Sequence, residues 1–227
     1  MISLSRKAAG LRCVLAAGLG VGALMTAAPS AHAYVYSSCG QWASWSGSGY
    51  TVYNDVWGAS SGQCIYINSA TSWHVTANFS GGGIKSYPHI QKGISLSYGS
   101  SRTCSFGASN GSGQWDLSFD NWTNAGDEIM IWENWTSGVG PAGSKKYSSV
   151  SINGATWNVY QGNVGHNCVS FLRTSHRNSG SENIGAISTW AHSHGLVGGS
   201  ATTSEQFGYE ITNTSGSQNF YLNSFSG

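Results

Sequence analysis

Two stretches near the middle of the chain decide how it should fold: QWDLSFDNW (residues 114–122) and EIMIW (residues 128–132). In both, large apolar residues alternate with a second set of residues that includes carboxylates. Successive side chains of a β-strand point to opposite faces of the sheet. The alternation therefore predicts two strands that each turn one face toward a core. The side chains predicted on the opposite face are Asp116, Ser118, Asp120 and Trp122 of the first stretch and Glu128, Met130 and Trp132 of the second.

A third stretch, FGYEIT (residues 207–212), has the same pattern and places Glu210 on the face opposite its aromatic residues. Two carboxylates on either side of a glycosidic bond are the basic equipment of glycoside hydrolysis. One must be ionised and the other protonated, so their surroundings must separate their pKa values. The alternative interpretation is that Glu128 and Glu210 are solvated surface acids, and the strand pattern by itself leaves both open.

The rest of the chain repeats this design on a smaller scale. Many short segments are apolar or alternating over the length of a strand, and turn sequences such as Ser80–Gly83 and Asn153–Gly154 separate them. Only residues 181–195, SENIGAISTWAHSHG, have helical spacing, with Ser181 as the expected N-cap and Gly195 as the C-terminal stop. We therefore predict an all-β, two-sheet antiparallel sandwich with a concave cleft and one short α-helix.

The first 33 residues have the features of a secretory signal peptide. Basic residues precede an apolar segment that ends in Ala31-His32-Ala33, which is an A-x-A cleavage pattern. We expect a secreted, extracellular protein whose mature part, residues 34–227, is a single domain. No later segment approaches the ~20 apolar residues that a membrane-spanning helix needs, so no membrane partner is expected.

The composition limits the other possible partners. A net charge of +1 leaves no electrostatic footprint for nucleic acid. Ten Trp and eleven Tyr in a chain with 8% charged residues favour a neutral partner with flat apolar faces, such as a polysaccharide, although aromatics also fill sandwich cores. His192 and His194 diverge on a helix and no Cys-x-x-Cys occurs, so we expect no metal and no other cofactor. We expect a monomer.

The cysteines leave a choice of disulfides. Cys13 lies in the predicted signal peptide, and the mature part keeps four cysteines. Four cysteines permit three pairings, among which the sequence does not choose. They are Cys39, Cys64, Cys104 and Cys168.

Beyond these patterns, the mature chain resembles the glycoside hydrolase family 12 endo-β-1,4-glucanases, which are secreted β-jelly-roll cellulases. The resemblance extends over almost all of residues 34–227 and depends on several short motifs in the family's order. They are YNDVWG (53–58), KSYPHI (85–90), SFDNW (118–122), DEIMIW (127–132), GPAGS (140–144), WNVYQGNVG (157–165), SFLRTS (170–175), FGYEI (207–211) and LNSFSG (222–227).

The resemblance implies roles for three carboxyl groups. Glu128 is the implied nucleophile and Glu210 the implied general acid/base of a mechanism that retains anomeric configuration, with the two groups ~5–5.5 Å apart. Asp120 is expected to orient Glu128, and its negative charge is expected to help keep Glu210 protonated. The implied substrate-binding residues are Asn54, Trp57, Met130 and Trp132, with a place in the core as the alternative for Trp57.

The implied activity is hydrolysis of internal β-1,4 bonds in cellulose, mixed-linkage glucan or xyloglucan, with a non-catalytic carbohydrate-binding sandwich as the alternative. The resemblance also implies a Cys39–Cys64 disulfide, and a Cys104–Cys168 pair follows only by elimination. Three residues depart from the family pattern: Asp55, Glu133 and His166. Glu133 is expected off the catalytic face, and His166 stands where the family often has an aromatic residue.

Overall fold

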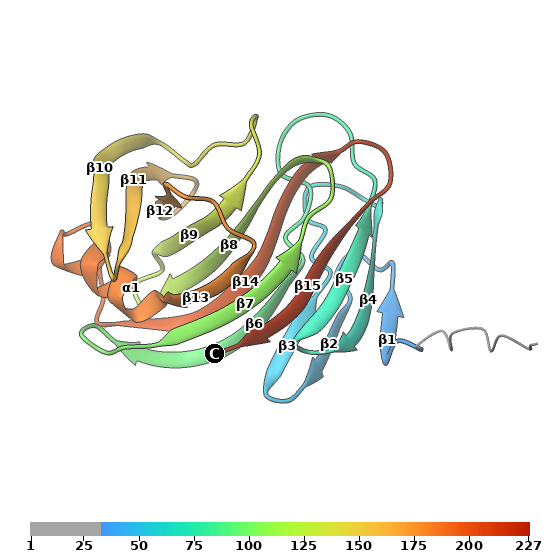
Figure 1. The fold of residues 1–227 in the computed structure, drawn as a ribbon, viewed down its shortest axis with the longest axis horizontal. Helices are drawn as coiled ribbons and strands as arrows, with labels where there is room; N and C mark the ends of the chain where they lie inside the picture. The colour runs from blue at the N-terminus through green and yellow to red at the C-terminus, as the bar shows by residue number, and fades with distance from the viewer. Residues whose placement is uncertain (1–32) are drawn as a thin grey trace, which may run out of the picture. The chain divides into compact units, whose positions relative to one another are not determined.

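A computed structural model describes residues 33–227, so the predicted signal peptide lies outside the described residues except for Ala33. This part of the chain is a sandwich of a nine-stranded and a six-stranded β-sheet with one helix (Figure 1). The predicted all-β jelly-roll sandwich is confirmed. No helix within residues 33–227 has the length and hydropathy needed to cross a membrane.

Both sheets combine strands from distant parts of the sequence. The nine-stranded sheet has the order β10 (Ser144–Ile152), β11 (Ala155–Asn163), β12 (Asn167–Arg173), β9 (Glu128–Trp135), β8 (Gly113–Thr123), β14 (Ala201–Thr214), β6 (His89–Ser97), β3 (Tyr50–Tyr53) and β2 (Ser44–Gly47). The six-stranded sheet has the order β1 (Tyr36–Ser38), β4 (Gln63–Ser69), β5 (Ser72–Ala77), β15 (Gln218–Ser226), β7 (Thr103–Ser109) and β13 (Ser179–Asn183).

One strand pair differs from the predicted antiparallel arrangement. β9 and β12 run parallel, with Cys168 opposite Glu128, whereas the other paired strands of the two sheets are antiparallel. A parallel pair requires a long connection between its strands. Here that connection is the β10–β11 hairpin, which extends the same sheet.

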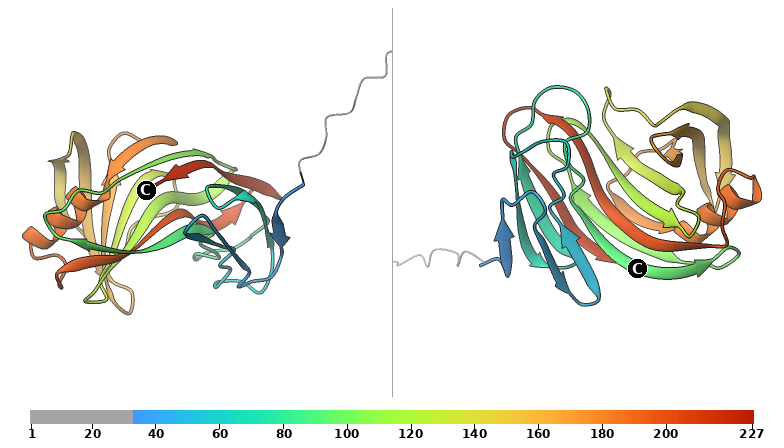
Figure 2. Two further views of the ribbon diagram at one scale, coloured as in Figure 1. Left: turned by 90° about the horizontal axis from the view of Figure 1, so that it is seen from below. Right: turned by 180° about the vertical axis from the view of Figure 1, so that it is seen from behind.

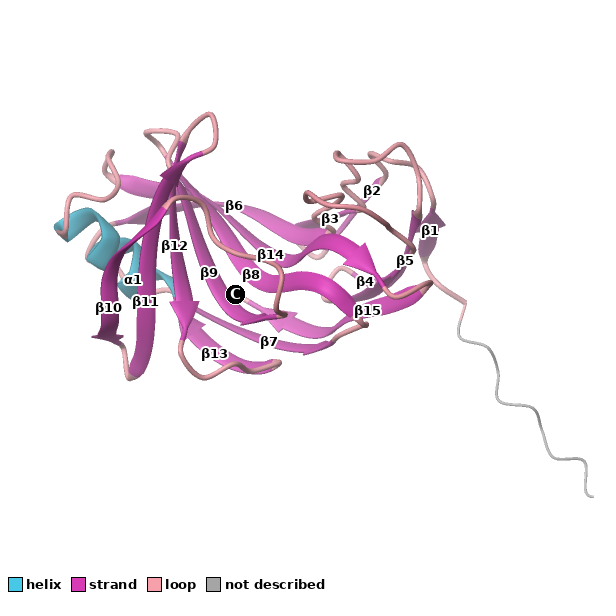
Figure 3. Cartoon of the chain, turned by 90° about the horizontal axis from the view of Figure 1, so that it is seen from above, coloured by secondary structure: helices cyan, strands magenta, loops and turns pink. Residues whose placement is uncertain are grey.

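The hydrophobic core lies between the sheets and confirms the predicted strand faces. The fully buried residues contributed by β8, β9 and β14 are Leu117, Phe119, Ile129, Ile131, Phe207, Tyr209 and Ile211. Each alternates with residues of the opposite, outward face, as period-2 geometry requires. The long strands of the nine-stranded sheet curve together along their length (Figures 2 and 3).

The helix is shorter than predicted. Helix α1 spans Ile184–Ser193, and its N-cap is Asn183, whose side-chain Oδ1 accepts a 3.0 Å hydrogen bond from the backbone N–H of Ala186. The predicted N-cap, Ser181, instead belongs to β13, where it pairs with Ser105. Asparagine satisfies free N–H groups at a helix start as well as serine does. The predicted stop at Gly195 is confirmed by its φ of +67°.

The disulfide pattern is partly as expected. Cys39 and Cys64 form the disulfide that the resemblance implied. Cys104 and Cys168 are free and buried. Cys104 packs in the core cluster between the sheets, while Cys168 packs with Met130 on the outer face of the nine-stranded sheet. The sheet itself therefore separates the two thiols, and the pairing by elimination is wrong.

Candidate active site

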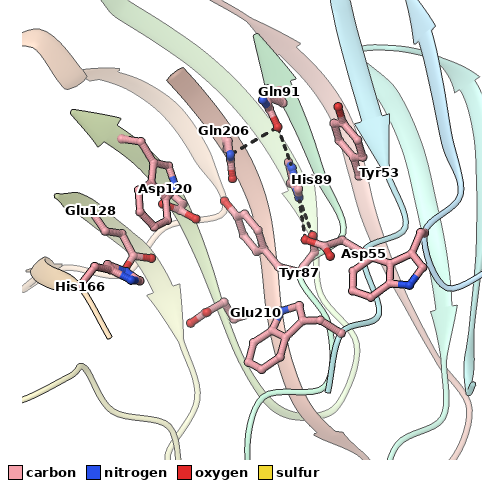
Figure 4. A pocket seen from close by; sticks show the side chains of 13 residues that line it. Tyr53, Asp55, Tyr87, His89, Gln91, Asp120, Glu128, His166, Gln206 and Glu210 are labelled. Atoms are coloured by element: carbon pink, nitrogen blue, oxygen red, sulfur yellow. Dashed lines mark hydrogen bonds and ion pairs between the residues drawn. The ribbon is translucent and has the colours of Figure 1, made fainter. Parts of the chain in front are cut away.

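The outward face of the nine-stranded sheet carries a cleft that gathers the predicted carboxyl groups. Asp120, Glu128 and Glu210 all line a cavity of about 700 Å³ (Figure 4). Glu128 and Glu210 also line an adjoining cavity of about 390 Å³, together with Trp57, Met130 and Trp132. The structure thus brings the two glutamates, which are 82 positions apart in the sequence (210 − 128), to one site.

Strand register puts these groups side by side. β8 lies between β9 and β14, so it presents its outward side chains to both glutamate strands. Glu210 of β14 is directly opposite Asp116, and Trp122 is directly opposite Glu128 of β9. Directly opposed side chains on one face of an antiparallel pair have Cβ atoms ~4.5–5.5 Å apart. Glu210 therefore has a carboxyl neighbour, Asp116, to which the sequence analysis gave no function.

The surroundings of Glu210 keep it protonated. Burial in the cleft raises its pKa well above the ordinary value, and the charges of Asp116 and Glu128 raise it further. Burial also raises the pKa of Asp116, to about 7, while the hydroxyl of Ser118 donates a 2.7 Å hydrogen bond to Asp116 Oδ1 and opposes the rise. Glu210 consequently has the proton that a general acid needs.

Glu128 lies at the start of β9 and is only 8% exposed, and its carboxylate contacts Cys168 and two further groups. His166 Nε2 is 2.9 Å from Glu128 Oε2, and Asp120 is hydrogen-bonded to Glu128 from β8. Burial, followed by the negative charge of Glu128, raises the pKa of Asp120 well above its ordinary value. The raised pKa favours a protonated Asp120 beside Glu128, whereas the resemblance implied a negatively charged one.

The predicted binding residues divide between the walls and the floor of the cleft. Trp57 is 51% exposed and lines both cavities. Trp42, which sequence reasoning missed, is 64% exposed beside it in the larger one. Met130 and Trp132 are buried and pack with Cys168, forming the floor of the smaller cavity. An exposed indole offers a flat apolar surface on which a pyranose ring can stack.

Comparison with known proteins agrees with this geometry. The sequence pattern of Glycosyl hydrolase family 12 matches residues 48–227. The chain belongs to this family. It is 33% identical over 165 residues, 60% of this chain and 67% of the relative, to Xyloglucan-specific endo-beta-1,4-glucanase A of Emericella nidulans. It is therefore a glycosidase of the endo-β-1,4-glucanase class.

Solved structures of the family have the same fold. The xyloglucanase domain of NopAA, a type three effector from Sinorhizobium fredii, in complex with cellobiose, superposes with a TM-score of 0.79 and 35% identity, covering 85% of this chain and 97% of that one. The native family 12 xyloglucanase from Bacillus licheniformis gives a TM-score of 0.75 at 25% identity, covering 84% of this chain and 98% of that one.

Asn54 was predicted to bind substrate, but it lies in the interior of this family 12 enzyme. It is fully buried, its Nδ2 donates a 2.8 Å hydrogen bond to the carbonyl of Gly40, and Gln63 Nε2 donates to its backbone and side-chain oxygens. Asn54 also binds Ala43 through its backbone N–H, at 2.8 Å. Its observed role is to fasten the segment before Trp57 to the segment that carries Trp42.

A polar wall of the family 12 cleft was not predicted. His89 stacks between the rings of Tyr53 and Tyr87, with centroids 5.0 Å and 4.6 Å away, and its Nδ1–H donates a 2.6 Å hydrogen bond to the carbonyl of Tyr87. Burial lowers the pKa of His89 to about 4, so the ring is neutral near pH 7. Asp55 lies 3.8 Å from the same ring, and burial raises its pKa to about 6. Strand alternation gives no sign of this stack, because it joins two segments that are distant in the sequence, Tyr53–Asp55 and Tyr87–His89.

Glu133 and the histidines of the helix lie outside the site. Glu133 is fully buried away from the cleft, where Arg177 donates hydrogen bonds of 2.6 Å and 2.9 Å to its two oxygens. The expectation that Glu133 leaves the catalytic face is confirmed. His192 and His194 stack separately, on Tyr98 and Trp190. Within residues 33–227, no three or more His, Cys, Asp or Glu side chains form a group that could hold a metal ion.

Proposed function

We propose that this endo-β-1,4-glucanase acts by a retaining double displacement with Glu128 as nucleophile and Glu210 as general acid/base. The observation that supports it most is that the two glutamates, from β9 and β14, line the same cleft cavities (Figure 4). Glu210 protonates the glycosidic oxygen while Glu128 attacks the anomeric carbon. Glu210 then removes a proton from the water that releases the sugar.

Replacing Glu128 tests the assignment of the nucleophile. The Glu128→Gln variant should lose activity by at least ~10⁴-fold, because a glutamine amide cannot replace the carboxylate that forms the glycosyl ester. Glucan binding and the unfolding midpoint should change little. Reducing ends released from carboxymethylcellulose measure the activity per folded molecule. Glu133→Gln, compared in the same way, serves as a control glutamate outside the cleft. A Glu128→Gln enzyme that cleaves at the normal rate would rule out the assignment.

Retention has its own test. Proton NMR of the first new reducing ends should show the β-anomer before mutarotation, because two inversions at the anomeric carbon restore the starting configuration. Early accumulation of the α-anomer would instead indicate a single displacement by water.

We propose xyloglucan as the preferred glucan. The relatives that support this are named as xyloglucan-specific endoglucanases or xyloglucanases. The exposed Trp42 and Trp57 supply stacking surfaces along one side of the cleft. Initial rates on xyloglucan, barley β-glucan and carboxymethylcellulose decide the matter, and a lower kcat/KM on xyloglucan than on either of the others would contradict it. The non-catalytic alternative has no use for a buried carboxyl pair and is not favoured.

We propose that the enzyme acts outside the cell after removal of residues 1–33. The signal-peptide pattern supports this, as does the Cys39–Cys64 disulfide, which is typical of oxidising compartments. N-terminal sequencing of protein recovered from the medium should begin at Tyr34.

A further inference from the structure

His166 makes a direct contact with the proposed nucleophile. Its Nε2 atom is 2.9 Å from Glu128 Oε2, and Figure 4 shows the ring beside the Glu128 carboxyl group. A carboxylate only accepts hydrogen bonds, so Nε2 is the ring nitrogen that carries hydrogen in this pair. The roles proposed for Glu128 and Glu210 do not explain why His166 contacts Glu128.

Three contacts hold the segment of His166 in place, and one of them involves its ring. His166 ends the turn between β11 and β12, in which Val164 N–H donates a 3.0 Å hydrogen bond to the carbonyl of His166. The ring packs against Trp122 with centroids 4.6 Å apart. The next residue, Asn167, is anchored by a 3.1 Å hydrogen bond from Nδ2 to Asp127 Oδ1. The donor is therefore pre-positioned toward Glu128 before any substrate binds.

We propose that His166 is a positioning residue that acts through Glu128 and assists the departure of Glu128 from the sugar in the second half of the reaction. This inference rests on the proposed function, in which Glu128 becomes an ester. The parallel pairing of β9 and β12 brings the two residues together, because Cys168, two residues after His166, is opposite Glu128. The residues next to Glu128 in the sequence do not predict its contact with His166.

The charge on Glu128 changes during the reaction, so a hydrogen bond from His166 to Glu128 affects the two halves of the reaction differently. In the first half, an oxygen of Glu128 bonds to the anomeric carbon as the glycosidic bond breaks, and the carboxylate loses its negative charge. In the second half, water bonds to that carbon and gives a proton to Glu210. The ester bond breaks, and its electron pair returns to Glu128.

A hydrogen bond to a charged oxygen is stronger than one to a neutral oxygen. The His166 N–H therefore stabilises the leaving carboxylate as its charge develops, which speeds the second half. The same bond stabilises the resting carboxylate and thus slows the attack that starts the first half. His166 neither gives up nor takes a proton in this scheme, and only the balance between the two steps changes.

A His166→Phe variant isolates the donor, because phenylalanine keeps a ring to pack against Trp122 and lacks the N–H. The probe is 2,4-dinitrophenyl β-cellobioside, whose good leaving group makes the first half fast. We expect the steady-state rate to fall by about tenfold or more, with a lower KM and a larger pre-steady-state burst of dinitrophenolate. Mass spectrometry of the quenched enzyme should show the glycosyl ester on Glu128 accumulating.

His166→Gln is the conservative variant, and its amide donor should restore part of the steady-state rate. A purely structural role for His166 would lower the burst and steady-state phases alike, and that result would overturn the proposal, as would an unchanged burst and rate. Thermal unfolding of both variants checks that they are folded. Failure of the proposed function itself is distinguishable, because Glu128→Gln would then remain active whatever the His166 variants do.

Discussion

At the scale of single residues, Asp116 controls the proton on Glu210. The two are directly opposed in the sheet, they share a hydrogen bond, and the pKa of Asp116 is about 7. Near and above that pH, Asp116 carries a negative charge that opposes ionisation of Glu210. One carboxyl group thereby helps its neighbour keep a proton at pH values where an isolated glutamate is ionised.

Replacing Asp116 should therefore lower the pKa of Glu210. In Asp116→Asn the charge is absent, so Glu210 should lose its proton at a lower pH, and less of it should be protonated at pH 7. Carbon-13 NMR titration of the glutamate Cδ atoms measures this shift. Asp55→Asn is the matched control, because burial alone raises the pKa of Asp55, and Asp55 does not contribute to the raised pKa of Glu210. An equal or higher Glu210 pKa in Asp116→Asn would contradict the explanation.

At the scale of elements, Glu133 lies on the core side of β9, at a β-bulge between β8 and β9. Leu117 pairs with Asn134 and the next residue, Ser118, pairs with Trp132, so Glu133 is the extra residue between them. The bulge leaves Glu133 without a partner in the strand ladder, while strand alternation keeps its side chain on the core face. There Glu133 joins an ion network behind the cleft, in which Arg177 bridges Glu133 and Glu182.

Removing only one charge of the Arg177–Glu133 pair should lower the free energy of unfolding more than removing both charges. Arg177→Gln leaves Glu133 buried without its bidentate partner and should lower the free energy of unfolding by about 3 kcal/mol. The double variant Arg177→Gln with Glu133→Gln removes both charges and should recover part of that loss. Urea unfolding at pH 7 measures both. Activity per folded molecule should stay near the parent value, and a single-variant loss below ~1 kcal/mol would show that solvent compensates the charge.

At the scale of the whole molecule, the Cys39–Cys64 disulfide ties the segment carrying Trp42 to the six-stranded sheet. The bond joins a loop next to β1 with β4 and spans 25 residues. In the chain-entropy model a loop of this length stabilises the fold by about 3 kcal/mol. The bond also limits the freedom of one wall of the cleft.

Removing the disulfide should destabilise the protein and loosen that wall. The Cys39→Ala with Cys64→Ala variant should lose about 3 kcal/mol of unfolding free energy in urea. Its KM for glucan should rise more than its kcat falls. The loosened wall carries Trp42, a proposed stacking surface for glucan, and it carries none of the three carboxyl groups proposed to act on the bond. Equal stability of the double variant and the parent protein would show that the packing alone orders this region.

Much of the site followed from local pattern, because the two-residue period of a strand is written in adjacent residues. That period placed Glu128, Glu210 and Asp120 on faces opposite the core, and the burial of Ile129, Phe119 and Tyr209 agrees. The disulfide and the implied roles of the carboxyl groups came from the family resemblance. Membership of glycosyl hydrolase family 12 could likewise be expected from motifs in the printed sequence.

The tertiary structure alone decided which groups touch. The register of β14 on β8 joined Glu210 to Asp116, and the parallel pairing of β12 with β9 brought His166 to Glu128. It also buried Asn54, which the motif had suggested for substrate. Such contacts depend on register and burial between segments far apart in the chain. The local alternation that defines each strand is the same in any register that keeps its apolar face inward, so it does not contain that information.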